Sequence, residues 1–238
     1  MSESQHTVAG TVLTMPVRVR KADVHSAMFT VDADAAQRLI DYSGLRAFQM
    51  RPGRAVVNLL LTRFIDCDLG RYNEFSFCVM VQPPRSEVRG LRGFGQAGTF
   101  VHRMVVDQTF TLEAGRQIWG YPKILADFTV HDGNPFGFDV SVDGSLIVEM
   151  GIGRGLPVPM PSRPQSLLTY TNIDGTIRET AAEQLASGFH ARIGGATVKL
   201  GGHPYAKELA SLGLPKRAMA CMSIANVDMT FGDASVIR

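Results

Sequence analysis

The sequence has few cysteines and few charged residues for its length. Its 238 residues include three cysteines, Cys67, Cys78 and Cys221, and none of them stands in a Cys-x-x-Cys spacing. This pattern gives no support to a zinc site, to thioredoxin-like chemistry or to a disulfide framework. Charged residues make up 19% and the formal net charge is +2, which is too small to predict binding to nucleic acid or to a membrane surface.

No long apolar run and no pattern typical of a secretory leader is visible. No apolar stretch reaches the ~18 residues of a membrane-spanning helix. The first residues, MSESQHTVAGTVL, lack a basic segment followed by an apolar one. We therefore expect a cytoplasmic protein in a reducing compartment.

Hydrophobic residues make up 45% of the chain, which indicates an extensive core. Helical patterns are confined to residues 32–44, 111–120 and 203–213, each ending in glycine, and Thr111 is the expected cap of the second. The remaining apolar runs are rich in β-branched and aromatic residues and predict strands. These runs are residues 55–66, 74–82, 98–106, 124–132, 136–144, 145–153, 189–200 and 222–232.

The predicted strands do not alternate with helices, which disfavours a doubly wound parallel sheet. Several are apolar throughout, as is typical of a sheet covered on both sides or of a closed barrel. The sequence therefore predicts one α+β domain over residues 1–238, mostly antiparallel, with a partly closed β-barrel or cone and a few flanking helices. The proline-rich residues 156–166 are expected to cross the surface of this domain, and a linker between two domains is the alternative.

Two further patterns carry little functional weight. Residues 89–98 contain GFGQAG, a match to a phosphate-loop pattern, but no strand–turn–helix unit frames it. A flexible connection between strands is the better prediction. His25 and His203 have no ligand-like partners nearby, so neither a metal nor another cofactor is predicted.

One lysine stands in an apolar segment, GRQIWGYPKILAD, over residues 115–127. Burial would strip hydration from the Lys123 ammonium and favour the neutral amine, which is the form that attacks a carbonyl. Pro122 would restrain the backbone beside it. The alternative interpretation is that the lysine stem lies along apolar surface while its head reaches water.

This segment resembles the signature of the acetoacetate decarboxylase family, Gly-Arg-Glu, then an aromatic or small pair, then Tyr/Phe-Pro-Lys. In that family the lysine after the proline forms a Schiff base with the substrate, and the resemblance gives this role to Lys123. Residues 70–81, GRYNEFSFCVMV, are similar to the family's Tyr-x-Glu strand entry. The resemblance thus implies that Glu74 is an active-site glutamate and a proton shuttle.

The chain departs from the family pattern at three points. A second lysine follows the nucleophile in the decarboxylase, but Ile124 stands here, and Gln117 replaces the glutamate of the signature. A second active-site glutamate would fall near Leu59 or Leu60, where there is no acid. These changes resemble relatives that keep the lysine for aldol condensation and dehydration of pyruvate with aldehydes.

A keto acid brings a carboxylate, for which an arginine is the natural partner. The resemblance places that arginine near the N-terminus, where Arg20 is preferred over Arg18 and Lys21. Arg116 and Arg103 are further candidates, although Arg116 is also expected to pair with an acid such as Glu113 or Glu74. The other predicted substrate-binding residues are Tyr121, Trp119 and His102, and Tyr72 is a further hydrogen-bond donor.

These observations predict a Schiff-base lyase that acts on a small keto acid through Lys123, with decarboxylation of a β-keto acid as the first choice. An aldolase–dehydratase that condenses pyruvate with an aldehyde is the close alternative. A non-catalytic binding protein for a small acid, on the same fold, is the third. The resemblance also implies a homo-oligomer.

Overall fold

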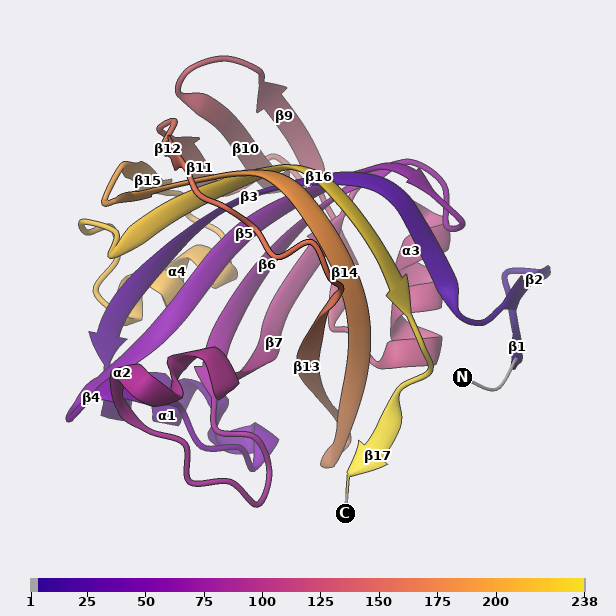
Figure 1. The fold of residues 1–238 in the computed structure, drawn as a ribbon, viewed down its shortest axis with the longest axis horizontal. Coiled ribbons are helices and arrows are strands. Elements are labelled where there is room, and N and C mark those ends of the chain that lie inside the picture. The colour runs from indigo at the N-terminus through magenta and orange to yellow at the C-terminus, as the bar shows by residue number, and fades with distance from the viewer. Residues whose placement is uncertain (1–3, 238) are drawn as a thin grey trace.

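The computed structural model describes residues 4–237, most of which lie in strands (Figure 1). The main sheet contains eight strands in a continuous order and three short strands paired at their sides. The continuous order is β12 (Leu156–Pro157), β14 (Thr176–Ile193), β13 (Gln165–Ile173), β7 (Gly98–Val106), β6 (Tyr72–Val81), β5 (Arg54–Cys67), β3 (Val17–Asp32) and β16 (Ala220–Phe231). The short strands are β4 (Gln49–Arg51), β8 (Lys123–Leu125) and β17 (Ser235–Ile237).

This sheet curls until its ends meet. The long strand β14 pairs with β13 through residues 176–184 and with β16 through residues 182–193. Strand β13 in turn meets β7 through two residue pairs in parallel orientation. Among the described pairings, those of β7 with β13 and with β8 are parallel and the others are antiparallel. The predicted α+β class, mostly antiparallel in a single partly closed domain, is confirmed.

Two smaller sheets complete the strands. One has the order β15 (Ala196–Leu200), β11 (Ser145–Ile152), β10 (Phe136–Val142) and β9 (Asp127–His131), and the other joins β1 (Gln5–Val8) to β2 (Thr11–Thr14). Outer-facing residues of the main sheet, such as Phe29 and Leu59, share one apolar cluster with Phe138 and Ile147 of the four-stranded sheet. Covering the main sheet in this way explains why its strands read as continuous apolar runs.

Two predicted helices form where expected. Helix α1 (Ala33–Ile40) begins after Asp32, whose side chain accepts from the backbone N–H of Ala35 at 2.9 Å. It continues as η1 (Asp41–Ser43) and ends at Gly44, which adopts φ +71°. Helix α4 (Pro204–Ser211) follows His203.

The other helices differ from the prediction. Helix α3 (Thr109–Ala114) is capped by the side chain of Gln108, which accepts from the backbone N–H of Thr111 at 2.7 Å. The prediction of Thr111 as the cap is therefore wrong, and its hydroxyl is left for another partner. The helix continues as η3 (Gly115–Trp119), a wider π-type turn. The connection over residues 89–98 contains a short helix, α2 (Gly90–Gly93), and η2 (Phe94–Gln96).

The proline-rich residues 156–166 cross the surface within the domain. They begin with β12, which pairs with β14, and lead into β13. Within residues 4–237 no helix combines the length and hydropathy that crossing a bilayer requires.

Helix α4 is fastened to the outer face of β7 by Glu208. This carboxylate accepts from Arg103 Nε at 2.9 Å and from Arg103 Nη2 at 2.6 Å, and it lies 3.1 Å from Nε2 of the buried His102. Burial alone would raise the pKa of Glu208, but the hydrogen bonds from Arg103 and His102 lower it from 4.5 to about 2. Burial lowers the pKa of His102.

These contacts predict a pH-dependent stability. The folded pKa of Glu208 lies below its ordinary value, so its contribution is complete above pH 4.5 and is lost as the pH falls toward 2. The substitution Glu208→Gln should lower the free energy of unfolding by about 2 kcal/mol at neutral pH and flatten its decline in that acid range. Urea unfolding at a series of pH values measures both effects.

The matched control is Glu149→Gln, which removes the exposed partner of Lys199. It should change the free energy of unfolding by less than ~1 kcal/mol. An unchanged acid profile in Glu208→Gln would contradict the assignment of the low pKa.

Candidate active site

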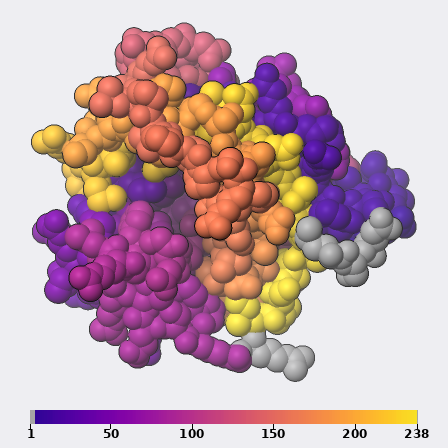
Figure 2. All heavy atoms as spheres, in the orientation of Figure 1, coloured from indigo at the N-terminus to yellow at the C-terminus, as the bar shows by residue number. Residues whose placement is uncertain are grey.

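A cavity of about 390 Å³ lies inside the curled sheet. Alternate residues of β5 face it: Asn58, Leu60 and Thr62 line the cavity, while Leu59 and Leu61 belong to the outer apolar cluster. Segments 95–99 and 166–169 also contribute to the lining. In Figure 2 a recess separates the magenta segment around α2 from the orange strands β13 and β14.

Lys123 is buried in the wall of this cavity, with 2% of its surface exposed. It opens β8, where it lies opposite Met104 of β7. The chain enters this strand from Gly120, which adopts φ +71°, and Arg116 Nε donates to the carbonyl oxygen of Lys123 at 2.8 Å. The turn at Gly120 and the hydrogen bond from Arg116 fix the backbone at Lys123, and the side chain points inward. The alternative interpretation, a lysine head in bulk water, does not hold.

The amine of Lys123 has two polar partners. Nζ lies 2.8 Å from Oε2 of Glu74 and donates to Oγ1 of Thr111 at 3.1 Å. Glu74 faces inward from β6, opposite Thr62 of β5. Inside a protein such a pair interacts more strongly than in water, and a proton can pass directly between its two atoms.

Two tyrosines border the amine. Nζ lies 5.3 Å from the ring centroid of Tyr72 and 5.8 Å from that of Tyr121. Tyr72 stacks on Phe64, and the Tyr121 hydroxyl is 3.0 Å from Thr169 Oγ1. Burial raises the pKa of both phenols, and the charge of Glu74 raises them further. Both therefore keep their protons at neutral pH and can donate to a substrate oxygen.

Gly115 makes room for the lysine stem. A Cβ atom at this position would lie 2.6 Å from both Cδ and Cε of Lys123. Sequence reasoning missed this role and that of Thr111, whose hydroxyl holds the amine. The available signal was a glycine inside a helical pattern, which usually has a packing or functional reason.

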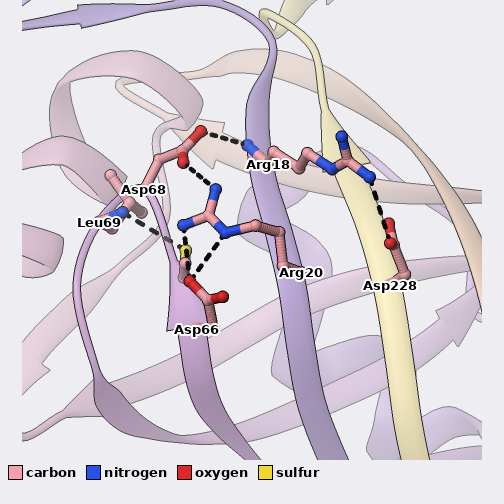
Figure 3. A network of polar contacts seen from close by, with 7 residues as sticks. Arg18, Arg20, Asp66, Asp68, Leu69 and Asp228 are labelled. Carbon is pink, nitrogen blue, oxygen red and sulfur yellow. Dashed lines mark hydrogen bonds and ion pairs between the residues drawn. The ribbon is translucent and has the colours of Figure 1, made fainter.

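The arginines predicted to bind a carboxylate lie elsewhere. Arg20 reaches away from the cavity to Asp66 and Asp68, at 2.8 Å and 2.6 Å, and Arg18 lies 3.5 Å from Asp228 (Figure 3). Neither arginine is among the residues that line the cavity. The strand β3 shifts register on either side of Lys21, and the acids at the end of β5 bind the guanidinium of Arg20.

Of the other predicted binding residues, two line the cavity and three lie outside it. Trp119 lines the cavity together with Tyr121, and its indole N–H donates to the carbonyl oxygen of Gly232 at 2.8 Å. His102 and Arg103 instead bind Glu208 on the outer face of β7, and the exposed Arg116 supports the backbone of Lys123.

The sequence predicts that Arg116 pairs with Glu113 or Glu74. In the structure its Nε donates instead to the backbone carbonyl oxygen of Lys123.

In the part of the chain that the structure describes, no three His, Cys, Asp or Glu side chains gather as ligands for a metal ion. The residues that do come together are Lys123, Glu74, Thr111 and the two tyrosines. They form a buried amine with an adjacent acid–base group and two neutral donors, an arrangement suited to attack on a carbonyl.

Comparison with known proteins supports this interpretation. The family model described as acetoacetate decarboxylase matches residues 5–237. No protein with a curated description matches the chain by sequence.

Solved structures of low sequence identity share the fold. A crystal structure of acetoacetate decarboxylase from Legionella pneumophila superposes with a TM-score of 0.68 at 20% identity, over 94% of this chain and 87% of that one. For the enduracididine biosynthesis enzyme MppR bound to pyruvate, the TM-score is 0.65 at 17% identity, over 93% and 90%.

An acetoacetate decarboxylase-like enzyme from Sphingomonas wittichii RW1 gives a TM-score of 0.55 at 16% identity, over 92% of this chain and 93% of that one. These likenesses concern the fold, whereas the family match covers the sequence almost from end to end. The chain therefore belongs to the acetoacetate decarboxylase family of enzymes.

Proposed function

We propose that this enzyme forms a Schiff base between Lys123 and the ketone of a β-keto acid and then releases carbon dioxide. The observation that carries the proposal is the contact between Lys123 and Glu74, 2.8 Å apart in the wall of a cavity. A cytoplasmic location and a homo-oligomer remain predictions.

The first steps use the two partners of the amine. Glu74 accepts a proton from Lys123, and the neutral nitrogen attacks the substrate ketone to give a carbinolamine. Protonated Glu74 returns its proton to the carbinolamine oxygen, which leaves as water, and the nitrogen becomes a positively charged iminium. The hydroxyl of Thr111, 3.1 Å from Nζ, keeps the nitrogen oriented during these transfers.

The iminium then accepts the electrons of the breaking bond. The bond between the α-carbon and the carboxylate breaks, its electron pair forms an enamine, and carbon dioxide departs. Protonation of the enamine carbon and addition of water to the resulting iminium release the ketone and restore the amine. The net reaction converts a β-keto carboxylate and one proton into a ketone and carbon dioxide.

The surroundings of the amine favour loss of the carboxylate. Apolar side chains such as Leu60, Met104 and Ile224 line the cavity, and Glu74 places a second carboxylate beside the reacting nitrogen. A substrate carboxylate there would be poorly solvated and repelled by Glu74, whereas carbon dioxide is neutral and apolar. Both effects raise the energy of the bound acid more than that of the decarboxylating state.

Aldol condensation followed by dehydration is the second candidate. MppR, which shares the fold, has been solved with pyruvate and with the condensation product of pyruvate and imidazole 4-carboxaldehyde. The same iminium on Lys123 would lose a proton from the adjacent carbon rather than carbon dioxide, and the enamine would attack an aldehyde. Gas evolution separates the two reactions. A non-catalytic binding protein would form no covalent adduct.

Borohydride trapping tests the Schiff base. Reduction in the presence of acetoacetate or pyruvate should attach the substrate carbon skeleton to Lys123, as located by peptide mass spectrometry, because the iminium becomes a stable amine. Release of carbon dioxide is monitored in parallel without reductant. The variant Lys123→Met should give no adduct, while Lys199→Met, which removes an exposed lysine paired with Glu149, should label like the wild type. Equal labelling of Lys123→Met would contradict the assignment.

The role of Glu74 predicts a kinetic defect. The substitution Glu74→Gln keeps the shape of the side chain but removes its proton-accepting group, so adduct formation should slow by roughly 10²–10⁴-fold. The initial rate of trapping over a range of pH values measures this effect. The dependence of that rate on pH should differ in shape from that of the wild type. Glu149→Gln serves as the matched control. A Glu74→Gln enzyme with a wild-type rate and pH profile would show that Glu74 does not transfer the proton.

The space provided by Gly115 predicts a positioning defect. In Gly115→Ala the new methyl group would overlap the Lys123 stem, so the amine should move and the trapping rate should fall by roughly 10²-fold. Gly202→Ala is the control, since nothing lies within 4 Å of its added Cβ. Circular dichroism verifies that both variants fold. A wild-type trapping rate in folded Gly115→Ala would contradict the role of this glycine.

A further inference from the structure

The cavity extends well beyond the reacting pair. Its volume of about 390 Å³ lies in the ~300–1,000 Å³ range of sites that enclose drug-sized ligands. Acetoacetate or pyruvate would fill a small part of it. The unfilled volume therefore indicates a larger substrate.

The strand register shows in which direction this space runs. Glu74 lies opposite Thr62, whereas Cys78, four residues farther along β6, lies opposite Asn58. At ~3.3 Å per residue this separation is about 13 Å. Asn58 also lies at the level of Val101 on β7, close to Thr99 and the connection that contains Gly95 and Ala97. The cavity thus runs along the strands from the amine toward the α2–η2 connection.

The far end of the cavity holds a polar atom that needs a partner. The side-chain oxygen Oδ1 of Asn58 is buried and accepts no hydrogen bond from the described residues. A buried acceptor that is left unpaired is unfavourable. Because Asn58 lines the cavity, a ligand in the cavity can supply the missing donor.

Mostly apolar residues line the cavity between this atom and the amine. Leu60, Met104 and Met222 line the cavity at the level between the two, where the hydroxyl groups of Ser26 and Ser76 also line it. Cys78 and Val101 add apolar surface at the level of Asn58. At the rim, Leu167 and Leu168 also line the cavity while remaining 41% and 37% exposed. Exposed leucines beside an opening suit the passage of an apolar chain.

We propose that the substrate is an elongated keto acid whose ketone meets Lys123, whose middle is an apolar chain, and whose far end donates a hydroxyl or N–H group to Asn58. This inference rests on the proposed function for its reacting end. The span of about 13 Å, less ~3 Å for the hydrogen bond, leaves about 10 Å. An extended chain advances ~3.4 Å for every three bonds, so the middle contains roughly nine bonds.

Binding of ketone-free analogues tests the Asn58 subsite independently of Schiff-base chemistry. Isothermal titration would compare a medium-chain fatty acid with the same acid carrying a terminal hydroxyl group. The wild type should bind the hydroxylated acid about tenfold more tightly, because it alone satisfies the buried oxygen. In Asn58→Leu this preference should vanish, while the plain fatty acid should still bind. Asn226→Leu changes an exposed asparagine of β16 outside the cavity and should keep the preference.

A second arm uses borohydride trapping with β-keto acids of increasing length, with and without a terminal hydroxyl group. The concentration for half-maximal labelling of Lys123 should be lowest for the long hydroxylated acid, and Asn58→Leu should remove that advantage. Equal affinity of the wild type for plain and hydroxylated acids would overturn the subsite, even if Lys123 is labelled by every keto acid. A hydroxyl preference that depends on Asn58, without any labelling of Lys123, would support the subsite and contradict the Schiff-base chemistry.

Discussion

The contact between the Lys123 amine and the Glu74 carboxylate is the constraint around which the interior is arranged. Charged groups are seldom fully buried without a partner, because the loss of hydration is large. Here each group supplies the other's counter-charge, and Thr111 adds a hydrogen bond. Three separate pieces of chain must meet for this to happen: the strand β6, the helix α3 and the short strand β8. The curl of the sheet brings them to the same wall of the cavity.

Much of the fold was predictable because its signals are local and repeated, but the predicted strands did not include β3, β13 or residues 176–188 of β14. Apolar runs separated by glycine and proline predicted strands, and Asp32 and His203 marked the starts of two helices that the structure contains. The third helix shows the limit of such reasoning, since Gln108 rather than Thr111 caps it. Side chains of glutamine are not among the preferred caps, so nothing in the local pattern distinguishes that position.

The residues that stand in a family motif could be predicted from the sequence. The residues whose role depends on which face of a strand they occupy could not. Lys123 and Glu74 came from resemblance, and the structure places them in contact. Arg20 alternates along β3 with Val17 and Val19, which line the cavity, so its side chain lies on the opposite face and reaches Asp66 and Asp68. His102 faces the outer layer at a point where β7 bulges. In a strand, one inserted residue exchanges the two faces, and a single sequence does not reveal where that happens.

The fit between Gly115 and the stem of Lys123 has a consequence for reading relatives of this chain. The glycine leaves a space that the lysine occupies, so we expect a change at one position to accompany a change at the other. A homologue that exchanged its lysine for a shorter side chain would leave a void that alanine or serine could fill at the position of Gly115. Covariation of these two columns in an alignment would therefore separate family members that retain the amine chemistry from those that have lost it.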